Sequence, residues 1–409
     1  MRELKRQNRV VIKWFERVEP ERTFLRTPDR DWTYGGTVDQ INRRSVSQPR
    51  AVSAGIDAEG VFGTLAGVAG GGVLMLTRGI EISTFPDLDG ASLVVFTSGT
   101  SGSPKGVRLT ASNLEAACQA SVEHLGHGPS DTWLVAMPMS HVGGISALLR
   151  SAYAGGSVRL LPEFDPNSFA SAMHDDVTMV SVVPTMLHRL LDHDPGPYAG
   201  LRAVLVGGGP IPKGLLERAV EAGLPVLPTY GMTETFGQIA TLRPDSPVRY
   251  HTHPLPGVDV RIDDDGRIAL RSRQISRGYL GESDRDDPWF VTSDVGEVDK
   301  EGALRVIGRA DAVIVTGGEN VNPERVEVEL VEHDEIDQAV IVGLPDVEWG
   351  SILVCLYVGS GEAGDFSDWL RGRLPGFMVP KRFIKVEAIP RTELGKVDRV
   401  VALGLAADG

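Results

Sequence analysis

A cluster of small and hydroxyl-bearing residues around Lys105 is the stretch of this chain best suited to bind an anion. The apolar residues 93–96 (LVVF) lead into a loop made of Thr97, Ser98, Gly99, Thr100, Ser101, Gly102, Ser103, Pro104 and Lys105. Glycines let backbone N–H groups approach an anion closely, hydroxyls donate further hydrogen bonds, and Lys105 adds positive charge. The pattern predicts a cradle for a polyphosphate, and we call residues 97–105 the phosphate loop.

The phosphate loop differs from the G-x-x-x-x-G-K-[ST] pattern of many nucleotide hydrolases. Here Gly106 follows Lys105, and no helix-opening hydroxyl comes after it. A flexible Ser/Gly linker is the plain alternative. Linkers seldom lie between a buried strand and a further apolar run, and they do not need Pro-Lys-Gly. We therefore favour an anion site.

A second candidate stretch, residues 229–235 (TYGMTET), follows an expected strand and combines hydroxyls, an aromatic ring and one carboxylate. Glu234 is suited to hold Mg²⁺ against phosphate oxygens, because hard cations prefer oxygen ligands, and Tyr230 is suited to stack on a base. The alternative is an N-capped helix start with Glu234 in its first turn. The stretch alone leaves both interpretations open.

Two more stretches gain meaning from their order in the chain. Asp294 (in TSDVG) lies shortly before Arg309 (in GRAD). An Asp after a strand is able to accept both hydroxyls of a ribose, and an Arg adds a cationic donor. Alone, such residues are more often a turn Asp and a surface Arg. Lys396 follows a Gly turn in PRTELGKVDR, where a lone lysine is usually solvated.

Composition bounds the class of protein. A chain of 409 residues is expected to form two or more domains, and an apolar fraction of 42% is typical of a well-packed soluble protein. The 48 Gly and 26 Pro indicate many tight connections, as in α/β folds. The net charge of −14 argues against nucleic-acid binding, which needs a basic surface. Small anions remain candidate ligands, because distant charges are screened over roughly 8–10 Å.

The chain also carries signs of a reducing compartment. Its two cysteines, Cys118 and Cys355, are far apart, which predicts neither a zinc site nor a disulfide framework. Residues 1–19 are too charged for a signal peptide. The uncharged run 61–77 is rich in Gly and is better read as a buried helix leading into a strand than as a membrane span. We expect a cytoplasmic protein without membrane insertion.

The elements that must position these residues alternate between strand and helix. We expect strands at 131–139, 157–161, 179–183, 203–206 and 225–227, with helices at 166–173, 185–191 and 213–222. A further helix runs through residue 125, with Thr110, Ser112 and Asn113 as candidate caps, and another follows Gly144 and runs through residue 153. This alternation predicts an α/β fold with mainly parallel sheets flanked by helices. Ligands of such sheets bind at the carboxyl ends of the strands, where His141, Gly207 and residues 230–235 would lie.

The pattern of predicted secondary structure changes twice after this region. Short strands and turns at about 255–308 indicate a small β subdomain, and a smaller α+β unit follows, with a loop at 316–322 before a helix at 323–331. We therefore expect an N-terminal domain of residues 1–308, with a lead-in at 1–90, and a C-terminal domain of residues 309–409.

Taken in order, the motifs resemble those of the adenylate-forming superfamily of acyl-CoA synthetases, peptide-synthetase adenylation domains and luciferases. The shared motifs run from about residue 93 to residue 399 and are TSGTSGSPKG, YGMTET, TSDVG, GRADAVIVTGGENVNPERVE and PRTELGKVDR. The resemblance implies ATP, Mg²⁺ and CoA as cofactor and co-substrates, a carboxylic acid as substrate, and a mobile C-terminal domain. It leaves a homodimer or a higher homo-oligomer open.

The resemblance also implies roles for individual residues. The phosphate loop, Thr97 to Lys105, would bind the β- and γ-phosphates, and Glu234 with Thr100 would hold Mg²⁺. Adenine and ribose would contact Gly207, Gly208, Gly209, Pro210, Tyr230, Gly231, Thr233, Asp294 and Arg309. Lys396 would bridge the acyl carboxylate and the α-phosphate, which makes Lys396, Glu234, Lys105 and Thr100 the implied catalytic set. Asp311 would be the hinge, and the loop Gly317, Gly318, Glu319, Asn320 would enter the site for thioester formation.

Within the superfamily, the segments SVVPTML, YGMTET with QIATL, and GGEN, together with the short length, look most like o-succinylbenzoate-CoA ligases of menaquinone biosynthesis. Another aryl- or acyl-CoA ligase, a stand-alone carrier-loading enzyme and a catalytically idle nucleotide-binding protein are the alternatives. Two departures are Ser293, where the family usually has Gly, and a lead-in shorter than usual.

The histidines give weaker signals. His124 with His127, and His251 with His253, lack a further clustered ligand, so structural or surface histidines are favoured over a metal site. His141 follows a strand on the expected cleft side. It is a candidate wall or gate of the acyl pocket, and a structural role is the alternative.

Overall fold

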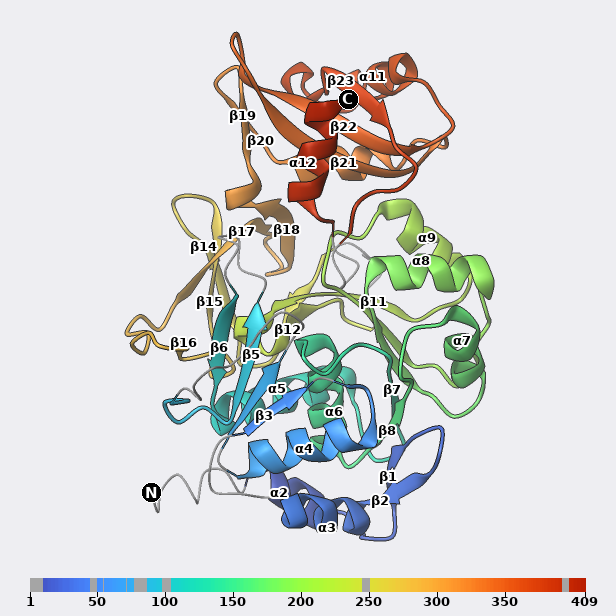
Figure 1. Ribbon diagram of the computed structural model, residues 1–409, viewed down its shortest axis with the longest axis vertical. Coiled ribbons are helices and arrows are strands. Elements are labelled where there is room, and N and C mark those ends of the chain that lie inside the picture. Colours follow the sequence, from blue (N-terminus) through green and yellow to red (C-terminus); the bar gives the residue numbers. More distant parts are fainter. Residues whose placement is uncertain are drawn as a thin grey trace.

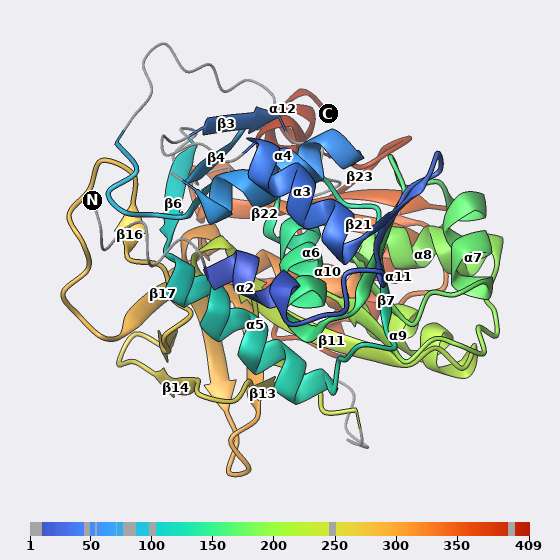
Figure 2. The same ribbon diagram turned by 90° about the horizontal axis from the view of Figure 1, so that it is seen from below.

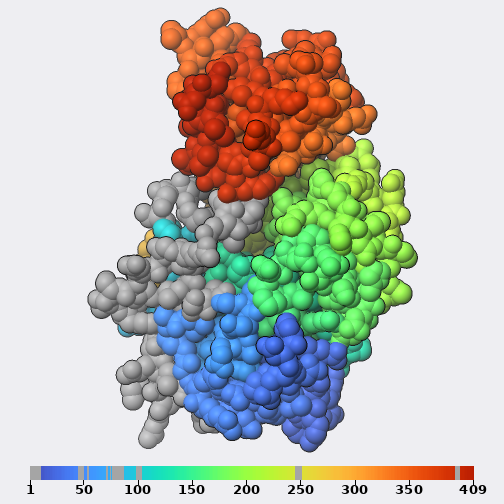
Figure 3. Space-filling view, turned by 45° about the vertical axis from the view of Figure 1, so that its right-hand side comes forward, coloured from blue at the N-terminus to red at the C-terminus, as the bar shows by residue number. Residues whose placement is uncertain are grey.

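The computed structural model describes residues 10–44, 50–53, 55–70, 72–76, 87–97, 104–244, 251–391 and 397–409. It has a large N-terminal domain built on sheets and a smaller C-terminal domain, drawn in orange and red at the top of Figure 1. In the space-filling view the C-terminal residues form a separate mass above the rest of the chain (Figure 3). The predicted α/β class, with a large domain followed by a smaller one, is confirmed.

The largest sheet has nine strands in the order β13-β12-β11-β10-β9-β7-β8-β1-β2. Its six consecutive strands β11-β10-β9-β7-β8-β1 pair in parallel. These strands are β1 (Thr23–Arg26), β2 (Asp31–Thr33), β7 (Thr132–Val135), β8 (Ser157–Leu160), β9 (Met179–Val182), β10 (Ala203–Val206), β11 (Val226–Met232), β12 (Gly237–Thr241) and β13 (His253–Pro254). The alternating helices are α6 (Val142–Ala154), α7 (Pro166–His174), α8 (Pro184–His193) and α9 (Lys213–Glu221).

Two strand predictions in this sheet need correction. The strand expected at 131–139 ends at Val135, because the chain turns at Pro138, whose carbonyl accepts a hydrogen bond from the His141 N–H at 3.1 Å. Conversely, β11 continues to Met232, well past the expected end at residue 227, because it pairs antiparallel with β12 along this extension. The longer strand carries Tyr230 and Gly231.

A second sheet, in the order β16-β6-β5-β4-β3, carries the phosphate loop. Its strands are β3 (Arg50–Ser53), β4 (Val73–Leu76), β5 (Leu93–Thr97), β6 (Lys105–Leu109) and β16 (Gly278–Tyr279), and the N-terminal helices are α2 (Val10–Glu16), α3 (Tyr34–Arg44), α4 (Ala58–Ala69) and α5 (Ala111–Leu125). Figure 2 shows α3 and α4 side by side, with α4 packed on β3 and β4. Of the uncharged run at 61–77, residues 61–69 belong to α4 and residues 73–76 to β4, which confirms the predicted helix leading into a strand. Within the described ranges, none of the helices has the length and apolar character that a membrane crossing requires.

Helices α5 and α6 join these two sheets. Leu114 of α5 and Leu148 of α6 lie in one buried core with Val95 of β5 and Trp133 of β7. The start of α5 is fixed by a capping box in which Thr110 accepts from the backbone N–H of Asn113 and the Asn113 side chain accepts from that of Thr110. This core holds the two sheets in a fixed relation, so their loops meet on one side.

A third, antiparallel sheet consists of β14 (Asp259–Ile262), β15 (Arg267–Arg271), β17 (Phe290–Val298) and β18 (Leu304–Arg309). It lies within the range expected for the β subdomain. The domain boundary expected between residues 308 and 309 falls at the end of β18 and stays a prediction.

The C-terminal elements are β19 (Ile314–Thr316), β20 (Glu319–Val321), α10 (Pro323–Leu330), β21 (Ile336–Asp346), β22 (Gly350–Gly359), α11 (Ala363–Arg371), β23 (Arg382–Lys385) and α12 (Arg399–Asp408). The loop expected at 316–322 is instead an antiparallel hairpin of β19 and β20. Gly317 (φ +58°) and Gly318 (φ +82°) form its turn, since glycine adopts two successive positive φ angles without steric cost.

Candidate functional site

Asp294 and Arg309 lie opposite each other, because they are cross-strand partners in β17 and β18. The Arg309 Nη1 atom lies 3.6 Å from Oδ1 of Asp294, and the Tyr230 hydroxyl donates to Oδ2 of Asp294 at 2.6 Å. Burial, followed by the charge of Asp294, raises the pKa of Tyr230, so this hydroxyl stays a donor. The fold thus brings Tyr230 into contact with Asp294, which lies 64 positions later in the chain and is paired with Arg309.

Asp311 is tied to this cluster. Its carboxylate accepts two hydrogen bonds from Arg309, from Nε at 2.7 Å and from Nη2 at 2.5 Å, within a short 3₁₀ turn at Ala310–Ala312. These hydrogen bonds, against the opposing effect of burial, raise the pKa of Arg309. The residue expected at the hinge is therefore in direct contact with a residue expected at the ribose.

Glu234 lies in a single 3₁₀ turn, Thr233–Thr235, which connects β11 to β12. The alternative of an α-helix start at this position is wrong, because Phe236 (φ +52°) and Gly237 (φ +85°) turn the chain back into a strand. The Thr235 hydroxyl donates to the carbonyl of Gly237 at 2.5 Å and accepts from the backbone N–H of Met232 at 3.1 Å. This turn, which we call the Glu234 turn (residues 233–237), presents Glu234 next to the second sheet.

The buried side chain of Gln274 and a backbone N–H group support the Glu234 turn. Gln274 donates through Nε2 to the carbonyls of Thr235 (3.0 Å) and Gln238 (2.9 Å), and the Ser276 N–H donates to the Glu234 carbonyl at 2.7 Å. Gln274 is fully buried. Because a buried polar network of this kind is costly to rearrange, the Glu234 turn is held in one conformation.

Tyr279 contacts both the Glu234 carboxylate and Lys105, the lysine of the phosphate loop. The Tyr279 hydroxyl donates to Oε1 of Glu234 at 2.9 Å, and Nζ of Lys105 lies 4.9 Å from the centroid of the Tyr279 ring. Lys105 also lies 3.7 Å from Oε1 of Glu282. Thr97 and Lys105 are cross-strand partners in β5 and β6. The remaining predicted residues of the loop, Ser98, Gly99, Thr100, Ser101 and Gly102, lie outside the described residues.

The carboxylate of Glu234 is a ligand of the kind that magnesium prefers. Within the described ranges no three His, Cys, Asp or Glu side chains are grouped to enclose a metal ion. Mg²⁺ is usually held by one or two carboxylates together with substrate phosphates and water. Glu234 supplies one such carboxylate beside a lysine that would face phosphates, so the residues present fit the expected ion.

The glycines expected at the adenine follow β10, which lies next to β11 with Val206 opposite Pro228. A Cβ on Gly207 would lie 2.8 Å from Cγ2 of Thr229, so glycine is needed for this close approach. Gly208 has a φ of +82°. Gly207 to Pro210 therefore leave the sheet beside Thr229 and Tyr230, at the carboxyl ends of two neighbouring strands.

His141 caps the start of α6 with its backbone, and its carbonyl accepts from the N–H groups of Gly144 and Ile145. The first turns of α6 pack on the Glu234 turn, since a Cβ on Gly237 would lie 3.9 Å from Cβ of Val142 and 3.7 Å from Oγ of Ser146. His141 is half-buried. The structure thus places it near the Glu234 turn, where its role at the acyl group stays a prediction.

Two expected groups belong to the C-terminal domain. Gly317, Gly318, Glu319 and Asn320 form the tip of the β19–β20 hairpin, where Gly317 packs against the ring of Trp349. Lys396 lies outside the described residues. The roles of both groups therefore stay predictions.

Sequence reasoning missed Tyr279, Glu282 and Gln274. Tyr279 and Glu234 are 45 positions apart, and they meet only because β16 pairs with the edge of β6. The available signal was the short stretch RGYLGES, whose aromatic residue between two glycines is typical of a turn at a strand edge.

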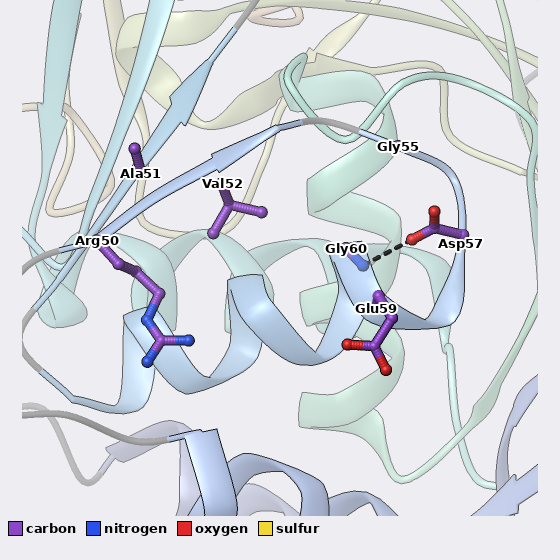
Figure 4. A pocket seen from close by; sticks show the side chains of 7 residues that line it. All are labelled: Arg50, Ala51, Val52, Gly55, Asp57, Glu59 and Gly60. Atoms are coloured by element: carbon purple, nitrogen blue, oxygen red, sulfur yellow. Dashed lines mark hydrogen bonds between the residues drawn. The ribbon is translucent and has the colours of Figure 1, made fainter. Parts of the chain in front are cut away.

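A separate hollow lies at the opposite edge of the second sheet, between β3 and the start of α4 (Figure 4). The Asp57 side chain there accepts from the backbone N–H of Gly60 at 2.7 Å and caps α4. Nη2 of Arg44 donates to both carboxylate oxygens of Glu59, to Oε1 at 2.7 Å and to Oε2 at 2.9 Å. These carboxylates serve the local fold, and we assign the hollow no part in the site.

Comparison with known proteins agrees with this geometry. The family model of AMP-binding enzymes matches residues 78–280, and that of the AMP-binding enzyme C-terminal domain matches residues 325–396. The 2-succinylbenzoate–CoA ligase of Bacillus cereus (strain ATCC 10987 / NRS 248) is 37% identical over 335 residues, which cover 76% of this chain and 69% of the relative. The ligase of the same name from Listeria monocytogenes serotype 4b is 37% identical over 326 residues, which cover 76% of this chain and 70% of the relative.

Solved structures show the same fold. The o-succinylbenzoate CoA synthetase of Bacillus subtilis, in complex with the acyl-adenylate intermediate, superposes with a TM-score of 0.82 at 27% identity, over 95% of this chain and 97% of that one. ATP-bound MatB from Rhodopseudomonas palustris gives a TM-score of 0.88 at 23% identity, over 98% and 99% of the two chains, which shows the fold alone. From the family models and the relatives together, the chain belongs to the AMP-binding enzyme family.

Proposed function

We propose that this protein is an ATP-dependent acid–thiol ligase that converts 2-succinylbenzoate to 2-succinylbenzoyl-CoA through an acyl-adenylate, as a step of menaquinone biosynthesis. The names of the two ligases described above support this substrate. The complex of the Bacillus subtilis enzyme with its acyl-adenylate supports the intermediate. We place the reaction in the cytoplasm, in keeping with two buried free cysteines.

The observation that carries the proposal is the contact of Tyr230, on the strand that leads into the Glu234 turn, with Asp294, which is paired with Arg309 across β17 and β18. Asp294 offers a carboxylate to the ribose hydroxyls, and Tyr230 with Gly207 to Pro210 offers a surface to adenine. Gly231 and Thr233 line the same strand end. An adenosine bound there would point its phosphates toward Glu234 and Lys105, the neighbouring charged groups.

Residues of this chain then hold the reacting atoms in place. The phosphate loop retains the β- and γ-phosphates, and Lys105 balances part of their charge. Mg²⁺ bound by Glu234 and Thr100 would neutralise further phosphate charge. Lys396 contacts the acyl carboxylate and the α-phosphate and favours their approach. Such a reaction depends mainly on positioning and charge neutralisation.

The reaction has two steps. A carboxylate oxygen of the acid forms a bond to the α-phosphorus while the bond to pyrophosphate breaks. The thiol sulfur of CoA then attacks the acyl carbon, its proton is lost, and AMP leaves with the bond electrons. Between the steps, the C-terminal domain turns about Asp311, and Gly317, Gly318, Glu319 and Asn320 replace Lys396 at the site. His141 borders the acyl group.

A panel of acids tests the proposal. Purified protein is incubated with ATP, Mg²⁺ and 2-succinylbenzoate, benzoate, malonate or medium-chain fatty acids, and pyrophosphate release and thioester formation are measured with and without CoA. We expect 2-succinylbenzoate to give both products. Turnover of another acid while 2-succinylbenzoate is ignored would refute the substrate, and pyrophosphate release without thioester would indicate a carrier protein as the acceptor.

Lys396→Ala tests the adenylation lysine, with Lys385→Ala as the matched control. Lys385 is exposed on β23. We expect Lys396→Ala to lower the rate of adenylate formation by about 100-fold or more, since losing a charge that acts in the transition state typically costs several kcal/mol. A normal rate in this variant would remove Lys396 from the mechanism.

A further inference from the structure

We propose that Tyr279 is a positioning residue that orients Glu234 and Lys105 together for Mg²⁺-bound ATP. The inference rests on the proposed function, because it assigns those two residues to the metal and the phosphates. Tyr279 itself has no charge and needs no contact with the reacting atoms. Its contribution would come from fixing two flexible charged side chains before ATP arrives.

The backbone of Tyr279 is anchored to the strand that carries Lys105. In β16, Gly278 lies opposite Arg108 and Tyr279 opposite Val107, and the Leu280 N–H donates to the carbonyl of Gly106 at 2.7 Å. A Cβ on Gly106 would lie 3.2 Å from Cβ of Leu280, so the two backbones approach closely. The Tyr279 ring is thus fixed relative to the end of the phosphate loop.

The buried Arg108 strengthens this anchor from the neighbouring position of β6. Its guanidinium donates to the carbonyl of Glu282 at 3.0 Å and pairs with Asp284 at 2.9 Å. Arg108 is 3% exposed. Because a buried charge needs its partners, the segment from Tyr279 to Asp284 is held firmly on β6.

The two ends of the Tyr279 side chain contact different partners. Its hydroxyl donates to Oε1 of Glu234, and its ring receives the Lys105 ammonium in a cation–π contact. The phenol is the donor and the carboxylate the acceptor in this hydrogen bond, which is 2.9 Å long. One rigid side chain therefore restrains both an acidic and a basic group.

This restraint has a chemical consequence. With Oε1 engaged by Tyr279, the carboxylate of Glu234 is fixed in rotation and its other oxygen remains for a hard cation. Lys105 has a flexible four-carbon side chain, and its contact with the ring limits the conformations it must give up when phosphate binds. Preorganisation of this kind raises affinity by lowering the entropy cost of binding.

Two variants separate the hydroxyl from the ring. ATP binding is measured by titration calorimetry, in Mg²⁺ and in EDTA, without any acid present. We expect Tyr279→Phe, which keeps the ring, to weaken binding of Mg²⁺-ATP by roughly tenfold and to leave binding in EDTA unchanged, because a hydrogen bond to a charged group is lost. Tyr279→Leu should weaken binding in both conditions, since Lys105 loses its contact as well.

Tyr198→Phe is the matched control. The Tyr198 hydroxyl donates to the carbonyl of Asp194 at 2.7 Å, and this hydrogen bond lies away from the site. It should match the wild type in both conditions. In the Glu234→Gln background, Tyr279→Phe should cause little further loss. An unchanged Mg²⁺-ATP affinity in Tyr279→Phe, or an equal loss with and without Mg²⁺, would overturn the inference while the ligase activity of the wild type still stands. A wild type that binds ATP but forms no adenylate from any acid would instead refute the proposed function.

Discussion

The carboxylate of Glu332 in the C-terminal domain caps a helix of the N-terminal domain, because its Oε1 accepts a hydrogen bond from the backbone N–H of Gly214 at 3.0 Å. Gly214 lies in the first turn of α9, whose N-cap residue, Pro212, provides no side-chain hydrogen bond. The first N–H groups of a helix need acceptors, and a negative charge there is favourable. The two domains therefore share one capping interaction.

We expect Glu332→Ala to shift the orientation of the C-terminal domain. Loss of a charged helix cap costs about 0.5–2 kcal/mol, which corresponds to a population change of roughly 2- to 30-fold. Single-molecule energy transfer between dyes on the two domains measures this shift. Gly214→Pro removes the donor of the same bond, so it should shift the orientation in the same direction. Asp334→Ala, at an exposed neighbouring position, is the control. If the two variants keep the wild-type distribution, the bond does not set the orientation.

Gly231 is required for the Glu234 turn. A Cβ at this position would lie 1.9 Å from the Gly237 carbonyl oxygen and 2.4 Å from its carbon, both backbone atoms that cannot move aside. We expect Gly231→Ala to lower the free energy of unfolding by about 1–3 kcal/mol or more and to reduce adenylation sharply. Urea unfolding and pyrophosphate release measure the two effects.

Gly364→Ala is the control for this substitution. Gly364 lies in α11, where an added Cβ meets nothing within 4 Å, so alanine should stabilise the helix by about 0.5–1 kcal/mol. A Gly231→Ala protein as stable and active as the wild type would mean that the Glu234 turn relaxes freely.

Local signals in the sequence predicted the helices and strands better than they predicted the contacts between side chains. Periodicity and capping residues such as Thr110 and Asn113 predicted the alternating strands and helices, because those signals act over a few residues. The motif order led to Asp294 and Arg309, but their contact depends on the register of β17 and β18. Tyr279 carried no chemical signal of its own, since its role arises only when β16 adds to the edge of β6. Long-range pairing of this kind is not written in any single stretch.

Asp294 should contribute mainly to ATP binding. Its carboxylate is only 15% exposed and already accepts from Tyr230, so an adenosine would meet an oriented acceptor. We expect Asp294→Ala to weaken ATP binding by roughly 10- to 150-fold, the range for losing hydrogen bonds to a charged group. Calorimetric titration with ATP measures this change. Asp259→Ala, which removes an exposed partner of Arg271 on β14, is the control. Equal affinities in Asp294→Ala and wild type would place the ribose elsewhere.

His127 should make stability depend on pH. It is 4% exposed, packs edge-to-face on Trp133, and within the described ranges neither ring nitrogen has a hydrogen-bond partner. Burial lowers its pKa to about 4, while Asp131 acts to raise it and Arg150 and Arg202 act to lower it. An ordinary histidine, as in the unfolded chain, has a pKa of about 6.5. Between about pH 4 and about pH 6.5, the imidazole is therefore protonated in the unfolded chain and neutral in the folded chain.

Stability should consequently fall as the pH drops from 7 to 5, by roughly 2 kcal/mol from this one group, and the effect should level off below about pH 4. Urea unfolding at several pH values measures the slope. His127→Phe keeps an aromatic ring against Trp133 but cannot take up a proton, so its stability should decline less over the same range. His193→Gln, which removes an exposed histidine from the end of α8, should retain the wild-type slope. Parallel slopes for His127→Phe and wild type would show that the buried imidazole is not the source, because only a group protonated differently in the two states changes stability with pH.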